Sequence, residues 1–330
     1  MKLSIDWVIL MNERDRFLQV NPEIAELLKN DSSLKWICSK EVIQSINTNS
    51  LRLPVLYLPN DIQFNINNFT VDNYMRFLLS LVVGNKLQGE ILYRNCCFTV
   101  EDVEEISKMI QKSFELVRTQ FIEYFSGLLG IEVKTEMSLM GDMVVALTIR
   151  VKFQEHYHGA LKDTFDFLKL CGYVVQELGN QGKLRANYSK YTVAAILYNW
   201  VVLHTSYDTT YKKYAFTGFS ALKYGYAVCQ GFTALYNALC KLCGINIVGM
   251  AGLGKPKNSR TPENHIWSYA YLDNRYVFID VTWGSPLFAD EATLRKYGVS
   301  SKYFCDFSYF DVPIDVFRRE HHWSIEDYGF

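Results

Sequence analysis

The feature that most constrains this chain is a carboxylate in the middle of an apolar strand. Residues 276–282 read Tyr-Val-Phe-Ile-Asp-Val-Thr, and Asp280 is the only charged residue among them. Burying a carboxylate among aliphatic side chains is costly unless it is paired or hydrogen-bonded. Asp280 therefore needs a partner that the surrounding sequence must supply.

A β-hairpin provides that partner. Residues 264–272 have the pattern of a strand, and Asp273-Asn274 is a turn signal before the returning strand. If these two residues form the loop, the numbers of facing residues sum to 547, so that 267 faces 280 and 265 faces 282. His265 and Asp280 then share a face as diagonal neighbours, roughly 7–8 Å apart at the backbone. This register predicts a hydrogen bond between them, whereas a three-residue loop would place them on opposite faces.

A cysteine stands at the start of a predicted helix upstream of this hairpin. The helix stops at Gly244 and has an apolar face made of Phe232, Leu235, Tyr236, Leu239 and Leu242. The N–H groups and partial positive charge at a helix N-terminus stabilise a thiolate at Cys229 and can hold an oxyanion. Gly231, which lacks a side chain, is expected to let a substrate backbone approach. A cysteine by itself is as often a small, inert core residue as a reactive one. The combination of Cys229 with His265 as its base and Asp280 to orient the imidazole predicts an activated nucleophile.

Three segments in this order resemble the transglutaminase-like core of the papain-related superfamily. They are Val228-Cys229-Gln230-Gly231-Phe232, His265-Ile266-Trp267 and Asp280-Val281-Thr282-Trp283, and the similarity covers residues 189–286. The resemblance implies an α+β fold with a papain-like core, in which the N-terminal catalytic helix packs on an antiparallel sheet. It also implies an enzyme, a cysteine hydrolase or acyltransferase with the catalytic triad Cys229, His265 and Asp280.

The implied reaction is thiol-dependent acyl transfer on a protein or peptide substrate. Attack on a peptide or carboxamide carbonyl gives a thioester, which water resolves in a cysteine protease-like hydrolase and an amine resolves in a transglutaminase. The resemblance implies no cofactor and no metal. The backbone N–H of Cys229 is the expected oxyanion donor, and the side chains expected to contact substrate or oxyanion are Tyr224, Tyr226, Gln230, Trp267 and Trp283.

A second hypothesis comes from a different class of protein. Under this hypothesis the core is a catalytically silent module, which binds a peptide or partner protein in the cleft that would hold the substrate in an active enzyme. The two hypotheses differ in geometry, because Cys229 and His265 need not lie within about 4 Å of each other in a silent module.

The polar run at residues 179–183 predicts a boundary between an N-terminal accessory region of mixed helix and strand, 1–182, and a catalytic domain, 183–330. Residues 249–264 are expected to form a long polar loop leading into His265. The other expected elements are a strand at 3–10, a helix from Asn21-Pro22-Glu23, helices after Thr70, Thr99 and Ser189, a hairpin over 131–153 and a helix over 160–178.

Composition excludes some partners and leaves others open. The 330 residues carry 34 Lys+Arg against 35 Asp+Glu, a net charge of −1, which argues against nucleic-acid and anionic-membrane binding. The absence of an export signal and of an apolar run of about 18 residues predicts a cytoplasmic protein with reduced cysteines. Cys240 and Cys243 have a CxxC spacing but no second ligand pair nearby, which favours core packing over zinc. The sequence leaves the oligomeric state open.

Overall fold

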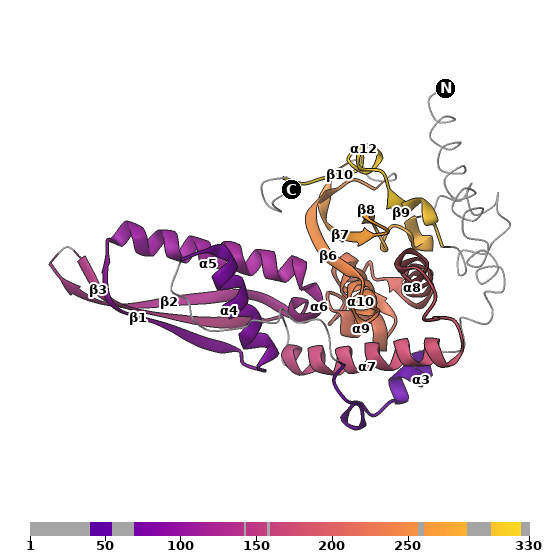
Figure 1. Cartoon of the computed structure of the whole chain (residues 1–330), viewed down its shortest axis with the longest axis horizontal. Helices are drawn as coiled ribbons and strands as arrows, with labels where there is room; N and C mark the ends of the chain where they lie inside the picture. Colours follow the sequence, from indigo (N-terminus) through magenta and orange to yellow (C-terminus); the bar gives the residue numbers. More distant parts are fainter. Residues whose placement is uncertain are drawn as a thin grey trace. The chain divides into compact units, whose positions relative to one another are not determined.

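The computed structural model describes residues 40–54, 69–141, 143–156, 159–256, 261–288 and 305–324 (Figure 1). The chain divides into two compact units, residues 58–165 and residues 1–57 together with 166–330. The strand expected at 3–10 and the helix expected after Asn21 lie outside the described residues. No helix in the described ranges combines the length and apolar character that crossing a membrane requires.

This division differs from the boundary expected between residues 182 and 183. The polar run at 179–183 is the end of helix α7 (Ala160–Asn180) and the turn that follows it. Gly182 has a φ of 70°, and the N–H groups of Lys183 and Leu184 both donate to the Leu178 carbonyl (2.9 and 3.1 Å). Glycine-rich polar residues serve helix ends and linkers equally well, and here they form a helix end inside the larger unit.

The smaller unit is a three-stranded antiparallel sheet, in the order β1-β3-β2, with helices. Its elements are α4 (Val71–Val83), β1 (Gln88–Phe98), α5 (Val100–Gln120), α6 (Ile122–Phe125), β2 (Leu128–Met140) and β3 (Met143–Glu155). The predicted helix starts are confirmed, because Thr70 caps α4 and a Thr99–Asp102 capping box opens α5. The rings of Phe114, Phe125 and Phe153 pack together in the core of this unit.

The larger unit contains a five-stranded sheet in the order β10-β6-β7-β8-β9 and a separate parallel pair, β4-β5. Its helical elements are α3 (Lys40–Ser45), η2 (Thr48–Ser50), α7, α8 (Lys190–His204), α9 (Gly218–Lys223), α10 (Cys229–Leu242), η3 (Pro286–Phe288), η5 (Phe307–Tyr309) and α12 (Ile314–Phe317). Its strands are β4 (Ser206–Tyr207), β5 (Tyr226–Ala227), β6 (Asn246–Gly254), β7 (Glu263–Leu272), β8 (Arg275–Ile279), β9 (Phe310–Val312) and β10 (His321–His322).

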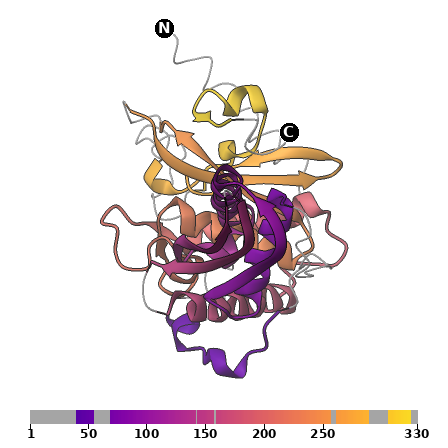
Figure 2. The same ribbon diagram turned by 90° about the vertical axis from the view of Figure 1, so that its left-hand side faces the viewer.

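The two faces of the five-stranded sheet are covered by different parts of the chain. On one face, α10 is joined to β7 by hydrogen bonds from Ser268 to the Asn237 side chain (2.7 Å) and from Thr233 to the Ile266 carbonyl (3.2 Å). On the other face, Trp267 and Phe317 pack in a core cluster with Met250, Phe278 and Val312. Figures 1 and 2 show α10 and the yellow C-terminal segment on opposite sides of the orange strands. The predicted α+β fold, with α10 on an antiparallel sheet, is confirmed.

The predicted hairpin register is confirmed. Leu272 faces Arg275 and Ser268 faces Ile279, and the loop residues Asp273 and Asn274 both have positive φ, 46° and 65°, as a type I′ turn requires. The returning strand ends at Ile279, earlier than expected. The reason is local: a carboxylate oxygen of Asp280 accepts the N–H groups of Thr282 (2.9 Å) and Trp283 (3.1 Å), which turns the chain out of the ladder.

The loop expected over 249–264 is shorter than predicted, because β6 extends to Gly254 and pairs with β7, which begins at Glu263. Gly252 and Gly254 in this strand are needed for close packing. A Cβ at Gly252 would clash with the carbonyl oxygen of His322, and one at Gly254 would lie 2.9 Å from the Cβ of His265. Glycine in a strand therefore marks a close approach here.

Candidate active site

Cys229 is the first residue of α10 and is partly buried. The preceding Val228 is extended, with φ −91° and ψ −179°, and no side chain caps the helix. Among the described residues, the N–H of Cys229 has no acceptor. A first-turn N–H of this kind is free to bind an anion that forms beside the sulfur.

The loop before α10 fixes the position of Cys229. The N–H of Asp208 donates to the Ala227 carbonyl (2.9 Å), and the N–H of Val228 donates to the Ala215 carbonyl (2.8 Å). The buried Asp208 carboxylate accepts the N–H of Thr210 (3.0 Å) and of Lys212 (2.6 Å). Burial alone would raise the pKa of Asp208, but the hydrogen bond that the Thr210 hydroxyl donates (2.7 Å), together with the two N–H groups, outweighs burial and lowers it.

Gly231 has a structural role that differs from the expected one. A Cβ at this position would lie 2.7 Å from the carbonyl oxygen of Thr217 and 2.7 Å from the Cβ of Ala227. The missing side chain therefore makes room for the protein's own loop, and the expectation that it admits a substrate backbone is corrected.

His265 and Asp280 form the hydrogen bond that the register predicts. His265 Nε2 lies 2.7 Å from Asp280 Oδ2, the carboxylate is fully buried, and the imidazole is 9% exposed. The Cys229 side chain is also a hydrogen-bond partner of His265. Because Nε2 is hydrogen-bonded to Asp280, Nδ1 is the ring nitrogen available to interact with the thiol. The three predicted chemical groups therefore lie together, with the imidazole between the sulfur and the carboxylate.

The electrostatics of this group favour charge on the imidazole. Burial alone lowers the pKa of His265, but the Asp280 carboxylate and Cys229 outweigh burial and raise it to about 10. For Asp280 the opposite holds: burial raises its pKa, whereas His265 and His321 bring it well below the ordinary value. At neutral pH the site therefore holds an imidazolium beside the Cys229 sulfur.

Of the side chains expected to contact substrate or oxyanion, Trp283 has its ring stacked on His265 at a centroid distance of 4.8 Å. Trp267 is fully buried in the core cluster, which does not fit the expected contact with substrate. Tyr226 stacks on Tyr224, and its hydroxyl donates to the Lys213 carbonyl (3.2 Å). The roles expected for Tyr224, Tyr226 and Gln230 at the oxyanion remain predictions.

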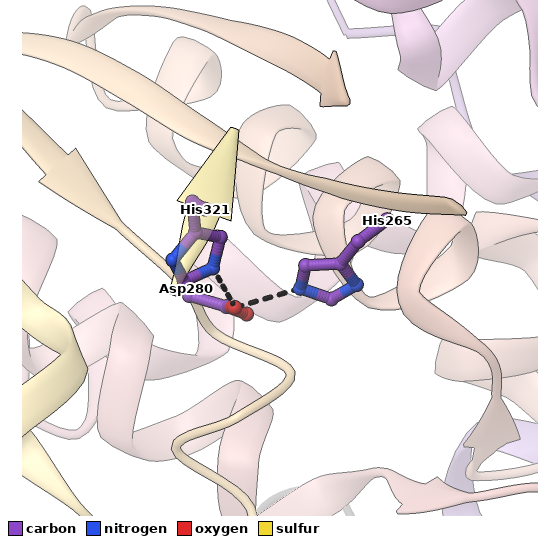
Figure 3. A group of neighbouring side chains, drawn as sticks. All are labelled: His265, Asp280 and His321. Carbon is purple, nitrogen blue, oxygen red and sulfur yellow. Dashed lines mark hydrogen bonds and ion pairs between the residues drawn. The ribbon is translucent and has the colours of Figure 1, made fainter. Parts of the chain in front are cut away.

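Two residues near the predicted triad were not found from the sequence. Tyr207, in β4, interacts with Cys229 electrostatically, and burial together with the sulfur raises its pKa, so that its hydroxyl stays protonated. No sequence pattern at this position points to the site. His321, in β10, places its Nε2 3.0 Å from Asp280 Oδ2 (Figure 3).

His265, Asp280 and His321 also satisfy a geometric condition for metal binding, since one ligand atom from each lies within 4.8 Å of the others. Ligand atoms around a tetrahedral zinc ion at about 2.0 Å are separated by about 3.3 Å. Here each imidazole nitrogen lies closer than that to the carboxylate, at 2.7 and 3.0 Å. The arrangement is that of a hydrogen-bonded cluster.

Comparison with known proteins finds a related family for one part of the chain. Residues 180–281, which include all three predicted catalytic residues, match the family described as the transglutaminase-like superfamily. The match is confined to this part of the chain.

The chain is 28% identical over 98 residues to kyphoscoliosis peptidase from Mus musculus and from Homo sapiens. The match covers 27% of this chain and 15% of each relative, so this chain spans only a small part of the relatives' length. A Cytophaga hutchinsonii structure, described as a candidate cysteine protease, is 17% identical over 48% of this chain and 67% of its own, with a TM-score of 0.29. A structure described as a TGase is 15% identical over 49% of this chain and 47% of its own, with a TM-score of 0.27.

Proposed function

We propose that the chain catalyses thiol-dependent acyl transfer, with a peptide or protein amide as substrate and water as acceptor. Cys229 is the nucleophile, His265 the acid–base group and Asp280 the residue that orients the imidazole. The observation that carries the proposal is the placement of His265, which bonds to Asp280 through Nε2 at 2.7 Å and has Cys229 as its other partner. The match of residues 180–281 to the transglutaminase-like superfamily supports it.

The steps follow from this arrangement. The Cys229 thiolate attacks the amide carbon, and the carbonyl oxygen becomes an oxyanion that accepts the free N–H of Cys229 at the start of α10. His265 gives its Nδ1 proton to the departing amine as the C–N bond breaks, which leaves a thioester. Water then attacks the thioester carbon and loses a proton to His265. The carboxylic acid is released, and the thiolate–imidazolium pair is restored.

Water as the acceptor is supported by the name of the mouse and human relatives, both called peptidases. An amine that replaces water in the second half would give transglutamination with the same residues. The acceptors are distinguished by incubating the protein with a glutamine-containing casein and a fluorescent primary amine, and by measuring incorporation of the amine against release of new peptide termini. Hydrolysis predicts new termini without incorporation.

The nucleophile is tested by the rate of alkylation with iodoacetamide at pH 7, followed by peptide mapping by mass spectrometry. Cys97 is exposed and serves as an internal reference for an ordinary thiol. We expect Cys229 to react at least about tenfold faster than Cys97, even though Cys229 is partly buried and Cys97 is exposed. The reason is that the thiolate is the reactive form of cysteine, and the proposal makes Cys229 a thiolate. His265→Ala should remove this advantage, and the Cys97 rate should be unchanged in that variant.

The catalytically silent module predicts a different result. A binding scaffold does not require an activated sulfur. Cys229 would then be alkylated no faster than Cys97, and His265→Ala would not change its alkylation rate. That outcome, in protein with an unchanged circular dichroism spectrum, would rule out the acyl-transfer proposal. A screen with a fluorogenic peptide library, with Cys229→Ala as the blank, then identifies the substrate class.

A further inference from the structure

The carboxylate of Asp280 is held from two sides by imidazoles. His265 Nε2 lies 2.7 Å and His321 Nε2 3.0 Å from the same oxygen, Oδ2. Figure 3 shows both rings directed at this one atom. The other oxygen, Oδ1, accepts the N–H groups of Thr282 and Trp283. The backbone contacts fix one end of the carboxylate, and His321 is the only side chain other than His265 that is recorded as a donor to it among the described residues.

His321 is itself held rigidly. It is 1% exposed and lies in β10, where it pairs with Gly254 of β6. Its ring lies parallel to that of Phe317, with centroids 3.7 Å apart and 6° between the planes, and 4.3 Å from Trp283. These contacts come from β6, α12 and the turn after β8, and the ring also lies 5.6 Å from that of His265, centroid to centroid. Most of the packing that holds the imidazole of His321 is therefore supplied by residues other than His265.

The proton on His321 can be assigned from the acceptors around it. Burial lowers the pKa of His321 and outweighs the opposing effect of Asp280, so that the ring is neutral at pH 7 and carries one proton. Nε2 faces the ionised carboxylate at 3.0 Å, whereas Nδ1 faces the Phe317 carbonyl at 3.3 Å. A carboxylate is the stronger acceptor, so the proton belongs on Nε2.

We propose that His321 is a positioning residue, which donates its Nε2–H to Asp280 and so fixes the carboxylate in the orientation that serves His265. This role rests on the proposed function of the triad. With the donor removed, the carboxylate keeps its backbone contacts but Oδ2 is held by His265 alone. The imidazole then loses part of its alignment toward Cys229, and misplacement of a catalytic group is costly to the rate.

Two substitutions separate hydrogen-bond donation from packing. His321→Gln removes the ring and retains an N–H donor at a similar reach, and His321→Phe retains a ring on Phe317 and removes the donor. A positioning role predicts that alkylation of Cys229 at pH 7 slows about tenfold in His321→Phe and stays within about twofold of wild type in His321→Gln. A role in packing alone predicts the reverse order, and that order would overturn the proposal.

A spectroscopic measurement keeps the proposal testable if His321→Phe does not fold. In wild-type protein labelled with ¹⁵N-histidine, long-range ¹H–¹⁵N spectra report which ring nitrogen of each histidine carries a proton. The proposal requires a protonated Nε2 on His321, and a bare Nε2 would overturn it. The spectrum does not depend on catalysis. If Cys229 of the wild-type protein reacts no faster than Cys97, the proposed function is wrong, and the spectrum still shows whether His321 donates a hydrogen bond to Asp280.

Discussion

The indole of Trp283 lies nearly parallel to the imidazole of His265, with ring centroids 4.8 Å apart and 14° between the planes. The indole is 3% exposed and also contacts His321. It therefore shields the bond between His265 and Asp280 from water. Hydrogen bonds to a charged group are stronger where water is excluded, so this contact links the packing of the site to its electrostatics.

Replacing Trp283 by leucine tests this link. We expect the alkylation rate of Cys229 at pH 7 to fall about tenfold, because water can then compete for the His265–Asp280 hydrogen bond. The matched control is Trp200→Leu, since Trp200 stacks on His204 in α8 with similar geometry, 4.6 Å and 13°. Both variants should lose about 3 kcal/mol of unfolding free energy. Equal alkylation rates in the two variants would show that shielding by Trp283 does not matter.

Asp280→Asn should destabilise the protein in a pH-dependent way. The pKa of His265 is raised from 6.5 to about 10, so its stabilisation is fully present below pH 6.5 and is lost as the pH rises through 10. The pKa of Asp280 is lowered, so its stabilisation is present above its ordinary value of 3.8 and is lost at more acidic pH. The loss of unfolding free energy should be about 3–5 kcal/mol near pH 5 and should shrink between pH 6.5 and 10.

Urea unfolding at pH 5, 7 and 9 measures this profile. Asp311→Asn is a suitable control, because the partner of Asp311 is Arg275, whose guanidinium keeps its charge throughout that range. The cost of the control substitution should not vary with pH. A cost of Asp280→Asn that is equally flat from pH 5 to 9 would contradict the charged state assigned to His265.

Gly231→Ala should destabilise α10 at its start. The new methyl group would meet the Thr217 carbonyl and the Ala227 Cβ at 2.7 Å, and overpacking of this kind costs about 1–3 kcal/mol. Alkylation of Cys229 should slow as well, because the helix start must shift. Gly179→Ala, in the last turn of α7, meets nothing within 4 Å and should instead stabilise by about 0.5–1 kcal/mol. Thermal unfolding of both variants measures these changes in stability. If Gly231→Ala leaves the stability unchanged, the loop at Thr217 moves aside without cost and the prediction is wrong.

Asp208→Ala should loosen the loop that precedes α10. The substitution removes the acceptor for the N–H groups of Thr210 and Lys212, and buried groups left unsatisfied cost about 1–3 kcal/mol each. Asp208→Asn keeps one side-chain oxygen and should recover about half of the loss. Hydrogen exchange of residues 208–217, measured by mass spectrometry, should increase in Asp208→Ala more than in Asp208→Asn. Unchanged exchange in Asp208→Ala would show that the carboxylate does not hold the loop.

Much of the site could be predicted from sequence because its determinants are local. The Asp273-Asn274 turn fixes the register of β7 and β8, and that register brings His265 and Asp280 together across only 15 positions. The apolar face of α10 and the glycine at 244 placed Cys229 at the first residue of its helix. The helix caps at Thr70 and Thr99 could also be predicted from sequence, because a capping side chain forms a hydrogen bond with the backbone of the same helical turn.

Other features depended on contacts that no local pattern encodes. The start of the loop expected over 249–264 lies in β6, where Gly252 and Gly254 allow His322 and His265 to pack closely. Gly231 suggested room for substrate, yet the nearby atoms belong to the loop at Ala215 and Thr217. In both cases a glycine signals a close approach, and only the fold identifies the neighbour.

The amino-acid sequence by itself determined the nucleophile's place on a helix, the register of the hairpin and the pairing of His265 with Asp280. The tertiary structure decided which side chains surround that pair. His321 reaches Asp280 from 41 positions away, through pairing of β10 with β6 at the edge of the sheet, and Trp283 covers His265 after a turn that Asp280 itself stabilises. Turns and helix starts follow from bonds between near neighbours, whereas the partner of a sheet edge is selected by the packing of the whole unit.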